Sequence, residues 1–268
     1  MALLSTNELR KAQLLQLSIL KELDKICRKN NISYFLSDGT LLGAIRHNGF
    51  IPWDDDLDVG MTRENYQYFC KIIETHLPEN IFFQTAKNDK GYGLSFAKLR
   101  LKGTKWLEKG TEDCSFKTGI YIDIFPFDDV CHNILFQKIK CYLHNKIEYI
   151  LYKKSYPHIH SSTIIKGVCV GCLYIIPKQV WLFILSLLEK KNKKSSKSSR
   201  YNFGRFFDIM VDKSVYEDLV LHKFEDGEFY IPRHYDLVLT KLFGDYMALP
   251  PIEKRKTHGI VAWDFGNY

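Results

Sequence analysis

Four aspartates fall within residues 54–58, and their spacing suggests metal chemistry. The last two, Asp56 and Asp58, alternate with Leu57 and Val59, which is typical of a β-strand with one apolar face. Residues two apart in a strand point to the same side, so we expect both carboxylates to face one way. Two close carboxylates repel unless a cation lies between them, and hard oxygen ligands suit Mg²⁺ or Mn²⁺. The pattern therefore predicts a divalent-metal site.

A possible phosphate cradle and a third acid accompany these aspartates. Gly39 and Thr40 follow a short apolar run and open an expected helix, and helix N-termini bind phosphate readily. Asp123 stands between Ile122 and Ile124 on a separate expected strand. Acids between apolar neighbours are costly to bury without a cation. We therefore expect Asp123 to join Asp56 and Asp58 as a metal ligand, with Gly39 and Thr40 holding a phosphate.

Three basic residues are candidates for contacting phosphate groups. Arg46 lies on the same expected helix as Gly39. Lys98 and Arg100 alternate on an expected strand, so their side chains share a face. A solvated helix or strand surface would explain each of the three equally well, so charge alone does not decide between these roles.

The elements that must position these residues are a mixture of helices and strands. Helical patterns cover residues 6–30, 40–48, 63–76 and 132–155, and strand patterns cover residues 32–36, 56–59, 81–85, 94–101 and 119–125. This mixture predicts an α+β (mixed α/β) fold, with a mixed sheet flanked by helices. We divide the chain into a catalytic core (1–130), a helical segment (131–200) and a C-terminal part that packs back on the core (201–268).

The helical segment contains the most apolar stretch of the chain, residues 167–188. Pro177 interrupts it near its middle, which argues against a membrane span of about 20 apolar residues. Six Lys or Arg and no acid follow between Lys190 and Arg200. An apolar segment beside a basic cluster suits peripheral contact with a membrane surface. Two buried helices followed by a solvated loop would give the same pattern.

Composition narrows the choice of partners and of compartment. The chain of 268 residues has 38 Lys and Arg against 31 Asp and Glu, a formal net charge of +7, which suits anionic partners. The basic residues are not interleaved with aromatics on one face, so we expect no nucleic acid. Seven cysteines and an N-terminus without a secretory signal predict a cytoplasmic protein, in possible contact with the inner face of the cell membrane. Cys169 and Cys172 form a lone C-x-x-C, to which we assign no role.

Three long segments resemble the LicD family of the nucleotidyltransferase superfamily. They are LSDGTLLGAIRHNGFIPWDDDLDVGM, YIDIFPFD and YIPRHYDLVLTKLFGDYMALPPIEKRKTH. The family comprises phosphocholine transferases and, more distantly, the fukutin-related glycan phosphotransferases. The resemblance implies an enzyme that moves phosphocholine from CDP-choline to a sugar hydroxyl of a glycan or glycolipid acceptor, such as a teichoic acid, lipopolysaccharide or capsule.

The resemblance also implies roles for particular residues. Asp56, Asp58 and Asp123 would be the metal ligands and catalytic acids of an in-line phosphoryl transfer that releases CMP. The matching tail, including Tyr246 and His258, would fold back and wall the substrate site, or act as a purely structural clasp. A quaternary ammonium is usually held by aromatic faces, and the sequence offers Trp53, Tyr121 and Trp263 without distinguishing among them.

Other functions remain compatible with the sequence. Another CDP-linked donor, with ribitol, glycerol or ethanolamine in place of choline, could use the same site. A nucleotidyltransferase acting on a small molecule would release pyrophosphate instead of CMP. A membrane-surface binding module with an inactive site is a non-enzymatic alternative, against which the intact set of three acids argues.

Overall fold

The computed structural model describes residues 4–155, 175–189, 195–200, 206 and 209–268. Its helices are α1 (Thr6–Lys29), α2 (Asp38–His47), α3 (Arg63–Ile72), α4 (Ile134–Ser155), α6 (Lys178–Leu188) and α7 (Tyr235–Phe243). Its strands are β1 (Phe35–Leu36), β2 (Asp58–Thr62), β3 (Ile81–Gln84), β4 (Ala97–Leu101), β5 (Lys105–Glu108), β6 (Tyr121–Asp129), β7 (Lys197–Ser199), β8 (Val211–Asp212), β9 (Leu219–Phe224), β10 (Gly227–Pro232) and β11 (Ile260–Asp264).

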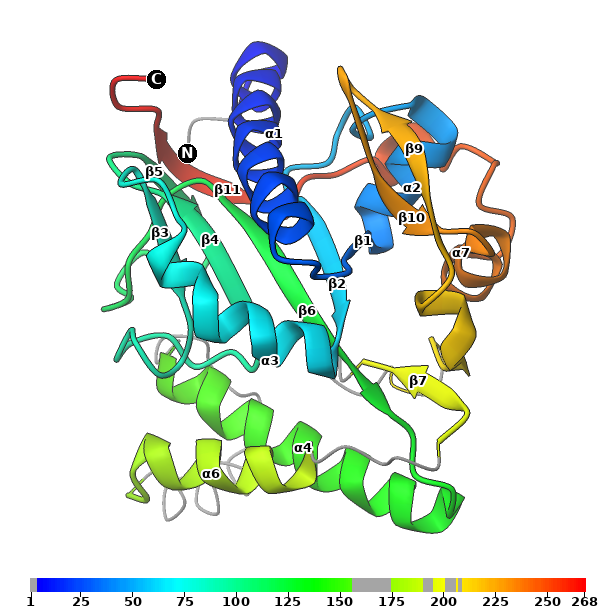
Figure 1. The fold of residues 1–268 in the computed structure, drawn as a ribbon. Helices are drawn as coiled ribbons and strands as arrows, with labels where there is room; N and C mark the ends of the chain where they lie inside the picture. Colours follow the sequence, from blue (N-terminus) through cyan, green and yellow to red (C-terminus); the bar gives the residue numbers. More distant parts are fainter. Residues whose placement is uncertain (1–3, 156–174, 190–194, 201–205, 207–208) are drawn as a thin grey trace.

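The central sheet is mixed, with strand order β1-β2-β6-β4-β3. Strands β2 and β6 run parallel, and the other neighbours along this path are antiparallel. The far end of β6 continues into a pairing with β7, which in turn pairs with β8. Helices flank this sheet (Figure 1), which confirms the α+β class predicted from the sequence.

Helices α1 and α3 lie together on one face of the sheet (Figure 1). The buried side of α1 includes Leu17, Leu20 and Leu23, which share the helical spacing seen in the sequence. They join one core with alternate residues of the central strands, among them Val59 and Ile122. Because strand side chains alternate, the positions between these apolar residues face away from α1 and α3.

Several elements are shorter than their sequence patterns indicate. The helix expected over 63–76 ends as an α-helix at Ile72 and continues as one 3₁₀ turn, Ile73–Thr75. The strand expected over 94–101 begins at Ala97, where β4 starts its pairing with Ile124 of β6. The strand expected over 32–36 is reduced to β1, which pairs with β2 at two positions. Helix α2 begins earlier than expected, at Asp38.

Two segments of the C-terminal part lie against residues of the first half of the chain. Strands β9 and β10 form an antiparallel hairpin beside β1 and α2 (Figure 1). Strand β11 pairs antiparallel with β5, so the end of the tail lies against the first half of the chain. The Arg10 guanidinium donates hydrogen bonds to the Glu225 carboxylate, at 2.9 Å and 2.5 Å, and so ties α1 to the hairpin turn.

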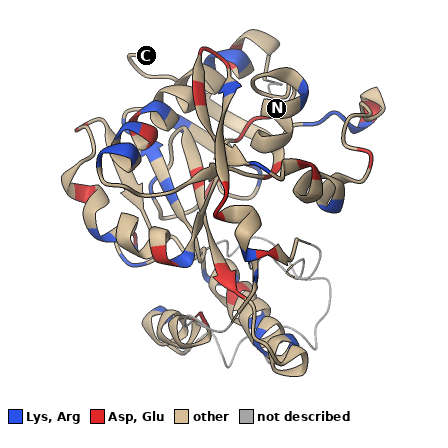
Figure 2. Cartoon of the chain, turned by 45° about the vertical axis from the view of Figure 1, so that its right-hand side comes forward, with Lys and Arg blue, Asp and Glu red and all other residues tan. Residues whose placement is uncertain are grey.

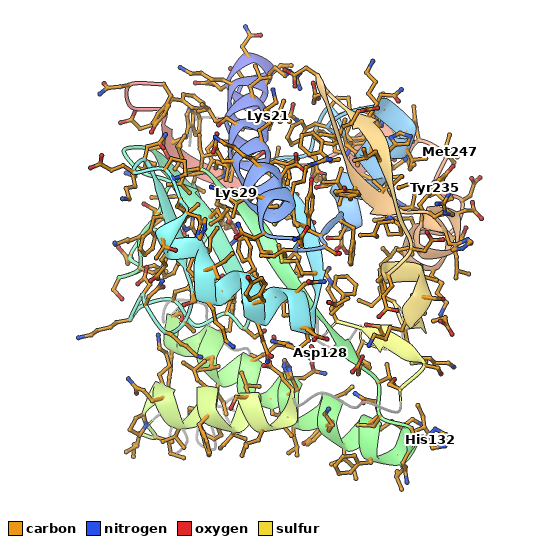
Figure 3. The ribbon with its side chains drawn as sticks, in the orientation of Figure 1. Lys21, Lys29, Asp128, His132, Tyr235 and Met247 are labelled. Atoms are coloured by element: carbon orange, nitrogen blue, oxygen red, sulfur yellow. The ribbon has the colours of Figure 1, made fainter. Side chains whose placement is uncertain are left out.

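Helices α4 and α6 pack on each other at one end of the molecule (Figure 1). A buried ionic network joins them to the sheet. The Arg63 guanidinium donates to both carboxylate oxygens of Asp128, at 2.8 Å and 2.7 Å, and lies 3.3 Å from Glu189. The His144 ring lies 3.2 Å from Glu189 and 3.4 Å from Glu148. Figure 2 shows acidic residues where β6 approaches the helix pair, and Figure 3 labels Asp128 there.

Within the described ranges, no helix is both long enough and apolar enough to cross a membrane. Helix α6, in the most apolar part of the sequence, has only 11 residues. The residues Cys169 and Cys172 lie outside the described ranges, as does the part of the basic tract from Lys190 to Lys194.

Because of this ionic network, we expect the folded protein to become less stable as the pH rises into the alkaline range. Burial disfavours the imidazolium of His144, but hydrogen bonds to Glu148 and Glu189 outweigh this and raise its pKa from 6.5 to about 9. The stabilisation is therefore complete below pH 6.5 and is lost as pH rises through about 9. We expect the free energy of unfolding to fall by up to about 3 kcal/mol over this range, as measured by urea titration.

The variant His144→Gln tests the assignment to this residue, because glutamine keeps a hydrogen-bonding side chain and does not titrate. Its unfolding free energy should vary much less between these two pH values. The matched control is His132→Gln, since His132 is exposed just before α4. An unchanged pH slope in His144→Gln would show that another group governs the loss.

Candidate active site

The parallel pairing of β2 with β6 brings two of the predicted acids together. Asp58 stands directly opposite Asp123 in the register of the two strands. The Asp123 backbone N–H donates to the Leu57 carbonyl oxygen at 2.8 Å, which fixes this register at its first position. Both side chains are buried, on the face away from α1 and α3. Two acids far apart in the sequence are therefore neighbours.

A cleft of about 640 Å³ collects the predicted acids. Asp56, Asp58 and Asp123 line it together with Asp54. Gly39 of α2 contributes to the same wall. The three acids proposed from the sequence thus line one cavity.

Asp56 reaches the cleft from a loop and not from a strand. The expected strand over 56–59 begins only at Asp58, so the sequence interpretation was wrong for Asp56. The reason lies in α1, where two buried glutamines hold the backbone of the acidic stretch. Gln13 donates to the carbonyl oxygens of Ile51 (3.2 Å) and Asp54 (2.8 Å). Gln16 donates to the carbonyl oxygen of Asp55 at 2.8 Å, so these carbonyl groups are bonded to α1 and not to a neighbouring strand.

The electrostatics of the cleft favour a cation. Burial raises the pKa of Asp58 well above its usual value, and the Asp56 and Asp38 carboxylates raise it further. Burial likewise raises the pKa of Asp56, with Asp54 as the strongest charged neighbour. Like charges at this depth repel strongly unless a positive group lies among them. The carboxylates are thus arranged to hold positive charge.

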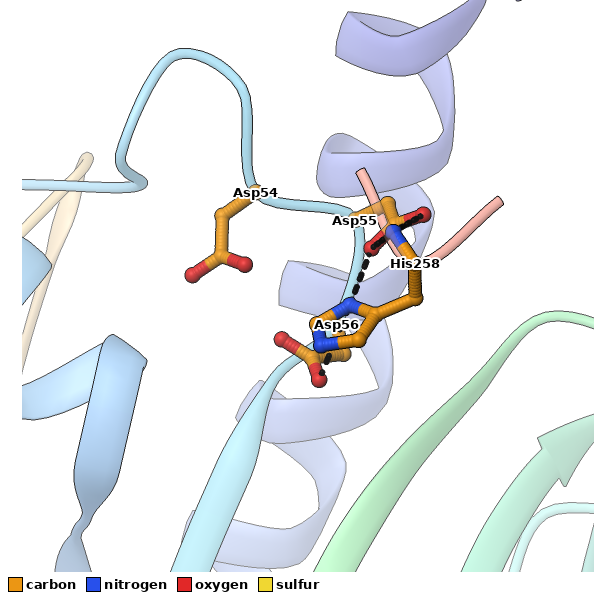
Figure 4. Close-up of side chains that lie close together, drawn as sticks. All are labelled: Asp54, Asp55, Asp56 and His258. Atoms are coloured by element: carbon orange, nitrogen blue, oxygen red, sulfur yellow. Dashed lines mark hydrogen bonds and ion pairs between the residues drawn. The ribbon is translucent and has the colours of Figure 1, made fainter. Parts of the chain in front are cut away.

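A tighter cluster overlaps the predicted set at one residue. Asp54, Asp55, Asp56 and His258 each offer a ligand atom, and these atoms lie within 4.8 Å of one another (Figure 4). Both Asp55 oxygens accept from the His258 backbone N–H, at 3.1 Å and 3.0 Å, and the His258 Nδ1 atom lies 2.6 Å from Asp55 Oδ1. Asp55 therefore serves to bind His258, and the His258 Nδ1 atom also lies 3.6 Å from Asp56 Oδ2.

Gly39 and Thr40 shape the acidic site directly. The Thr40 hydroxyl oxygen accepts from the Asp58 backbone N–H at 2.8 Å, so it fixes the start of β2. A Cβ atom at Gly39 would lie 2.7 Å from the Asp54 Oδ2 atom, so a larger residue would displace this carboxylate. Gly39 lines the cleft where a phosphate was expected, whereas Thr40 is buried and is not among the described residues that line it.

Arg46 lies in the larger cleft and holds the C-terminal tail. Its Nη1 atom donates to the carbonyl oxygens of Tyr246 (2.9 Å) and Ala248 (3.3 Å). Tyr246, Pro250 and His258 of the tail also line this cleft. The tail is thus part of the cavity wall, and the hydrogen bonds from Arg46 help to hold it there.

Lys98 and Arg100 line a second cavity of about 230 Å³, which meets the larger cleft at Asp56 and Asp123. The Lys98 ammonium lies 2.6 Å from Asp123 Oδ1 and 3.4 Å from the centroid of the Tyr121 ring. Arg100 donates to the Gly119 carbonyl oxygen at 2.8 Å. The two residues share a face, as their alternation predicted, and Lys98 neutralises one of the acids.

Sequence reasoning missed Arg200, whose buried guanidinium lies in the larger cleft. Its Nη2 atom donates to Asp38 at 2.7 Å, and the guanidinium lies 4.0 Å from the centroid of the Phe125 ring. Its Nε and Nη1 atoms are buried and make no hydrogen bond in the described part of the chain. Nothing in the sequence distinguishes Arg200 from the lysines that precede it in the basic tract.

The three aromatic candidates lie in different places. Trp53 lines the larger cleft, where the Arg255 guanidinium lies 4.9 Å from its ring centroid. Tyr121 lines the smaller cavity. Trp263 lines neither cavity and donates to the Glu8 carboxylate at 2.9 Å.

The attachment of the tail can be tested with Asp55→Asn. The substitution removes the negative charge and replaces one acceptor oxygen with a donor, so the segment before His258 should open more often. We expect trypsin to cleave at Lys254–Lys256 roughly tenfold faster, since a hydrogen bond to a charged group contributes about 1.5–3 kcal/mol. The control is Asp226→Asn, which alters an exposed ion pair with Lys21. Equal cleavage rates would show that Asp55 does not hold the tail.

The acidic region belongs to a known family domain. Residues 31–160 match the model described as LicD/FKTN/FKRP, nucleotidyltransferase domain. This range contains Gly39, Asp56, Asp58 and Asp123.

The chain is also similar to individual proteins. It is 30% identical, over 94% of its length and 96% of the relative's length, to the lipopolysaccharide cholinephosphotransferase LicD of Haemophilus influenzae. Two shorter matches each cover 55 residues, or 20% of the chain. The chain is 47% identical there to an uncharacterized protein of Rickettsia typhi, and the match covers 18% of that protein. It is 46% identical to an uncharacterized protein of Rickettsia prowazekii, and the match covers 21% of that protein. The similarity along nearly the whole chain and the acid-lined cleft in the matched domain agree: the chain belongs to the LicD family of transferases.

Proposed function

We propose that this protein transfers phosphocholine from CDP-choline to a sugar hydroxyl of a cell-surface glycan and releases CMP. The observation that carries the proposal is that Asp56, Asp58 and Asp123 line one cleft in a chain that aligns along 94% of its length with a lipopolysaccharide cholinephosphotransferase. That relative favours lipopolysaccharide as the acceptor over a teichoic acid or a capsule.

Mg²⁺ or Mn²⁺ fits the residues of this cleft. Asp56, Asp58 and Asp123 would hold it, with Asp54 close by. The fit rests on carboxylate oxygens, which are the donors these ions prefer, and on burial that raises the pKa of each of the three acids. When bound, the ion supplies charge neutralisation for the phosphate oxygens in the transition state.

The chain's own residues account for the remaining steps. The acceptor hydroxyl oxygen attacks the phosphorus that carries choline, and the bond from this phosphorus to the bridging oxygen of CMP breaks in line. Asp123 accepts the hydroxyl proton. Burial raises the pKa of Asp123, and Lys98, which lies 2.6 Å away, acts in the opposite direction and lowers it. Lys98 therefore favours the ionised form of Asp123, which is the form that can accept a proton. The CMP phosphate leaves with the bridging oxygen.

We infer that Arg200 binds a phosphate of the donor. Its Nε and Nη1 donors are buried and lack partners among the residues that the structure describes, and the Arg200 side chain lines the cleft. A guanidinium presents a fork of donors that matches phosphate oxygens. Asp38 holds the third nitrogen at 2.7 Å and so fixes the direction of the fork.

The matched domain description, nucleotidyltransferase, favours one alternative reaction. Attack at the phosphorus attached to the nucleoside would transfer a nucleotidyl group and release pyrophosphate from a nucleoside triphosphate. Other CDP-linked donors, with ribitol, glycerol or ethanolamine, would give CMP as CDP-choline does. The identity of the released product therefore separates the two reactions, and the rate with each donor identifies the head group.

The first test presents the purified protein with CDP-choline, Mg²⁺ and a lipopolysaccharide acceptor, with CMP release as the readout. We expect Asp58→Asn to reduce turnover by roughly a hundredfold or more, because the site loses a charge that holds the ion. Chelation of divalent ions should abolish turnover, and added Mg²⁺ or Mn²⁺ should restore it. Asp226→Asn is the control. Full activity of Asp58→Asn, or release of pyrophosphate from CTP instead, contradicts the proposal.

The second test concerns Arg200. We expect Arg200→Gln to raise the KM for the donor roughly tenfold to a hundredfold, as for a lost hydrogen bond to a charged group. Calorimetry should show weaker binding of CMP but unchanged binding of cytidine, since only CMP carries the phosphate. Arg200→Lys should recover part of the affinity, and Arg233→Gln, at an exposed ion pair, is the control. Equal losses for CMP and cytidine would assign Arg200 a merely structural role.

A further inference from the structure

The first half of helix α4 exposes apolar residues, whereas its second half buries apolar residues such as Ile147, Ile150 and Leu151. On its inward side the helix also carries polar or charged side chains: Gln137, Lys140, His144 and Glu148. Its outward face carries large apolar side chains that are between 43% and 65% exposed: Ile134, Leu135, Phe136, Ile139, Tyr142 and Leu143. A helix on the surface of a water-soluble domain normally has the opposite distribution. The outward face of α4 therefore favours a surrounding other than water.

Helix α6 adds a second exposed apolar row. Val180, Phe183 and Leu187 are exposed at helical spacing, while Trp181 and Leu185 on the other side pack with α4. No charged residue occurs from Gln179 to Leu188. We call the exposed residues of the two helices the α4–α6 face.

The ionic network fixes which side of α4 faces the core. His144 on the inner side lies 3.2 Å from Glu189, and Glu189 lies 3.3 Å from Arg63 of α3. The Glu148 carboxylate accepts from the Ser95 hydroxyl. Turning the helix would leave these buried charges without partners, which costs more than the exposed apolar area regains. The apolar side of α4 is thus held outward by the contacts on the opposite side.

The exposed charged residues of the α4–α6 face are all basic. Lys138 and Lys146 are exposed between the apolar residues of α4, and no exposed residue of α4 or α6 is acidic. Figure 2 shows the lysines of α4, in blue, at the foot of the molecule. Lys197, which opens β7 after the basic tract, is exposed as well. An anionic partner with an apolar interior would match both properties of this surface.

We propose that the α4–α6 face docks on the surface of a membrane that contains anionic lipids. Amphipathic helices with lysines beside apolar residues bury the apolar side at the headgroup boundary and attract anionic headgroups. A second copy of this chain fits less well. A two-fold interface places the same patch on both partners, so lysines would meet lysines with no acid between them.

Docking would bring the active site close to lipid-linked substrates, a consequence that rests on the proposed function. Helix α4 runs from the exposed apolar residues to Tyr152, which lines the smaller cavity beside Asp123. The rise of about 1.5 Å per residue puts Tyr152 roughly 20 Å along the axis from Ile139. A glycan attached to a lipid could therefore reach the acids without leaving the membrane.

Flotation of the full chain with vesicles tests the docking without any donor or acceptor. We expect binding to vesicles of phosphatidylglycerol and phosphatidylcholine. Ile139→Ser combined with Phe183→Ser should weaken this binding about tenfold or more, because two apolar side chains no longer enter the boundary. The control combines Leu14→Ser with Leu221→Ser, at apolar positions of similar exposure on α1 and β9. Circular dichroism verifies that each variant is folded.

A second pair of variants tests the charge. Lys138→Glu with Lys146→Glu should weaken binding to anionic vesicles and leave any binding to pure phosphatidylcholine vesicles unchanged. Two results would overturn the proposal. One is vesicle binding that is absent in the native chain or insensitive to the serine variants. The other is a dimer, found by sedimentation, that the same serine variants convert to a monomer. Neither result depends on whether CDP-choline is the donor.

Discussion

The repulsion among buried carboxylates is the constraint around which this structure is arranged. The parallel pairing of β2 and β6 places Asp58 opposite Asp123, and a loop held by glutamines of α1 adds Asp56. Such a group of charges persists only where surrounding contacts hold each member and cations balance the sum. Lys98 and Arg200 supply two of these cations, the first paired with Asp123 and the second with Asp38. The remaining negative charge is what makes the cleft suitable for a divalent ion and a phosphate.

The contacts that complete the site come from distant parts of the chain. Asp55 binds His258, and Arg46 binds carbonyl groups of the tail, so the acidic loop and the tail depend on each other. Arg200 arrives from the end of β7, and β7 is itself paired with the end of β6. A site assembled in this way forms only when most of the chain is folded. This agrees with a similarity to the Haemophilus influenzae enzyme that extends along nearly the whole sequence.

Sequence patterns identified the parts that follow simple periodicity. The apolar spacing of α1 and the placement of Asp123 between Ile122 and Ile124 reflect burial, which repeats regularly along helices and strands. The strand assigned to Asp56 failed because Gln13 and Gln16 take its neighbouring carbonyls, and such long-range hydrogen bonds leave no periodic signal. Arg200 was missed for a similar reason, since its burial depends on the partner Asp38, 162 positions away. The inverted polarity of α4 was hidden because its buried polar residues obtain partners only in the fold.

Strand β6 carries Asp123 near one end and Asp128 near the other. Asp128 binds Arg63, which anchors the helix pair through Glu189, so one stiff strand connects the acids to the α4–α6 face. The height of the acids above a docked bilayer is then a fixed dimension of the fold. Such an enzyme would act as a molecular ruler, and it would select the sugar of its acceptor by distance from the lipid anchor as much as by chemical identity.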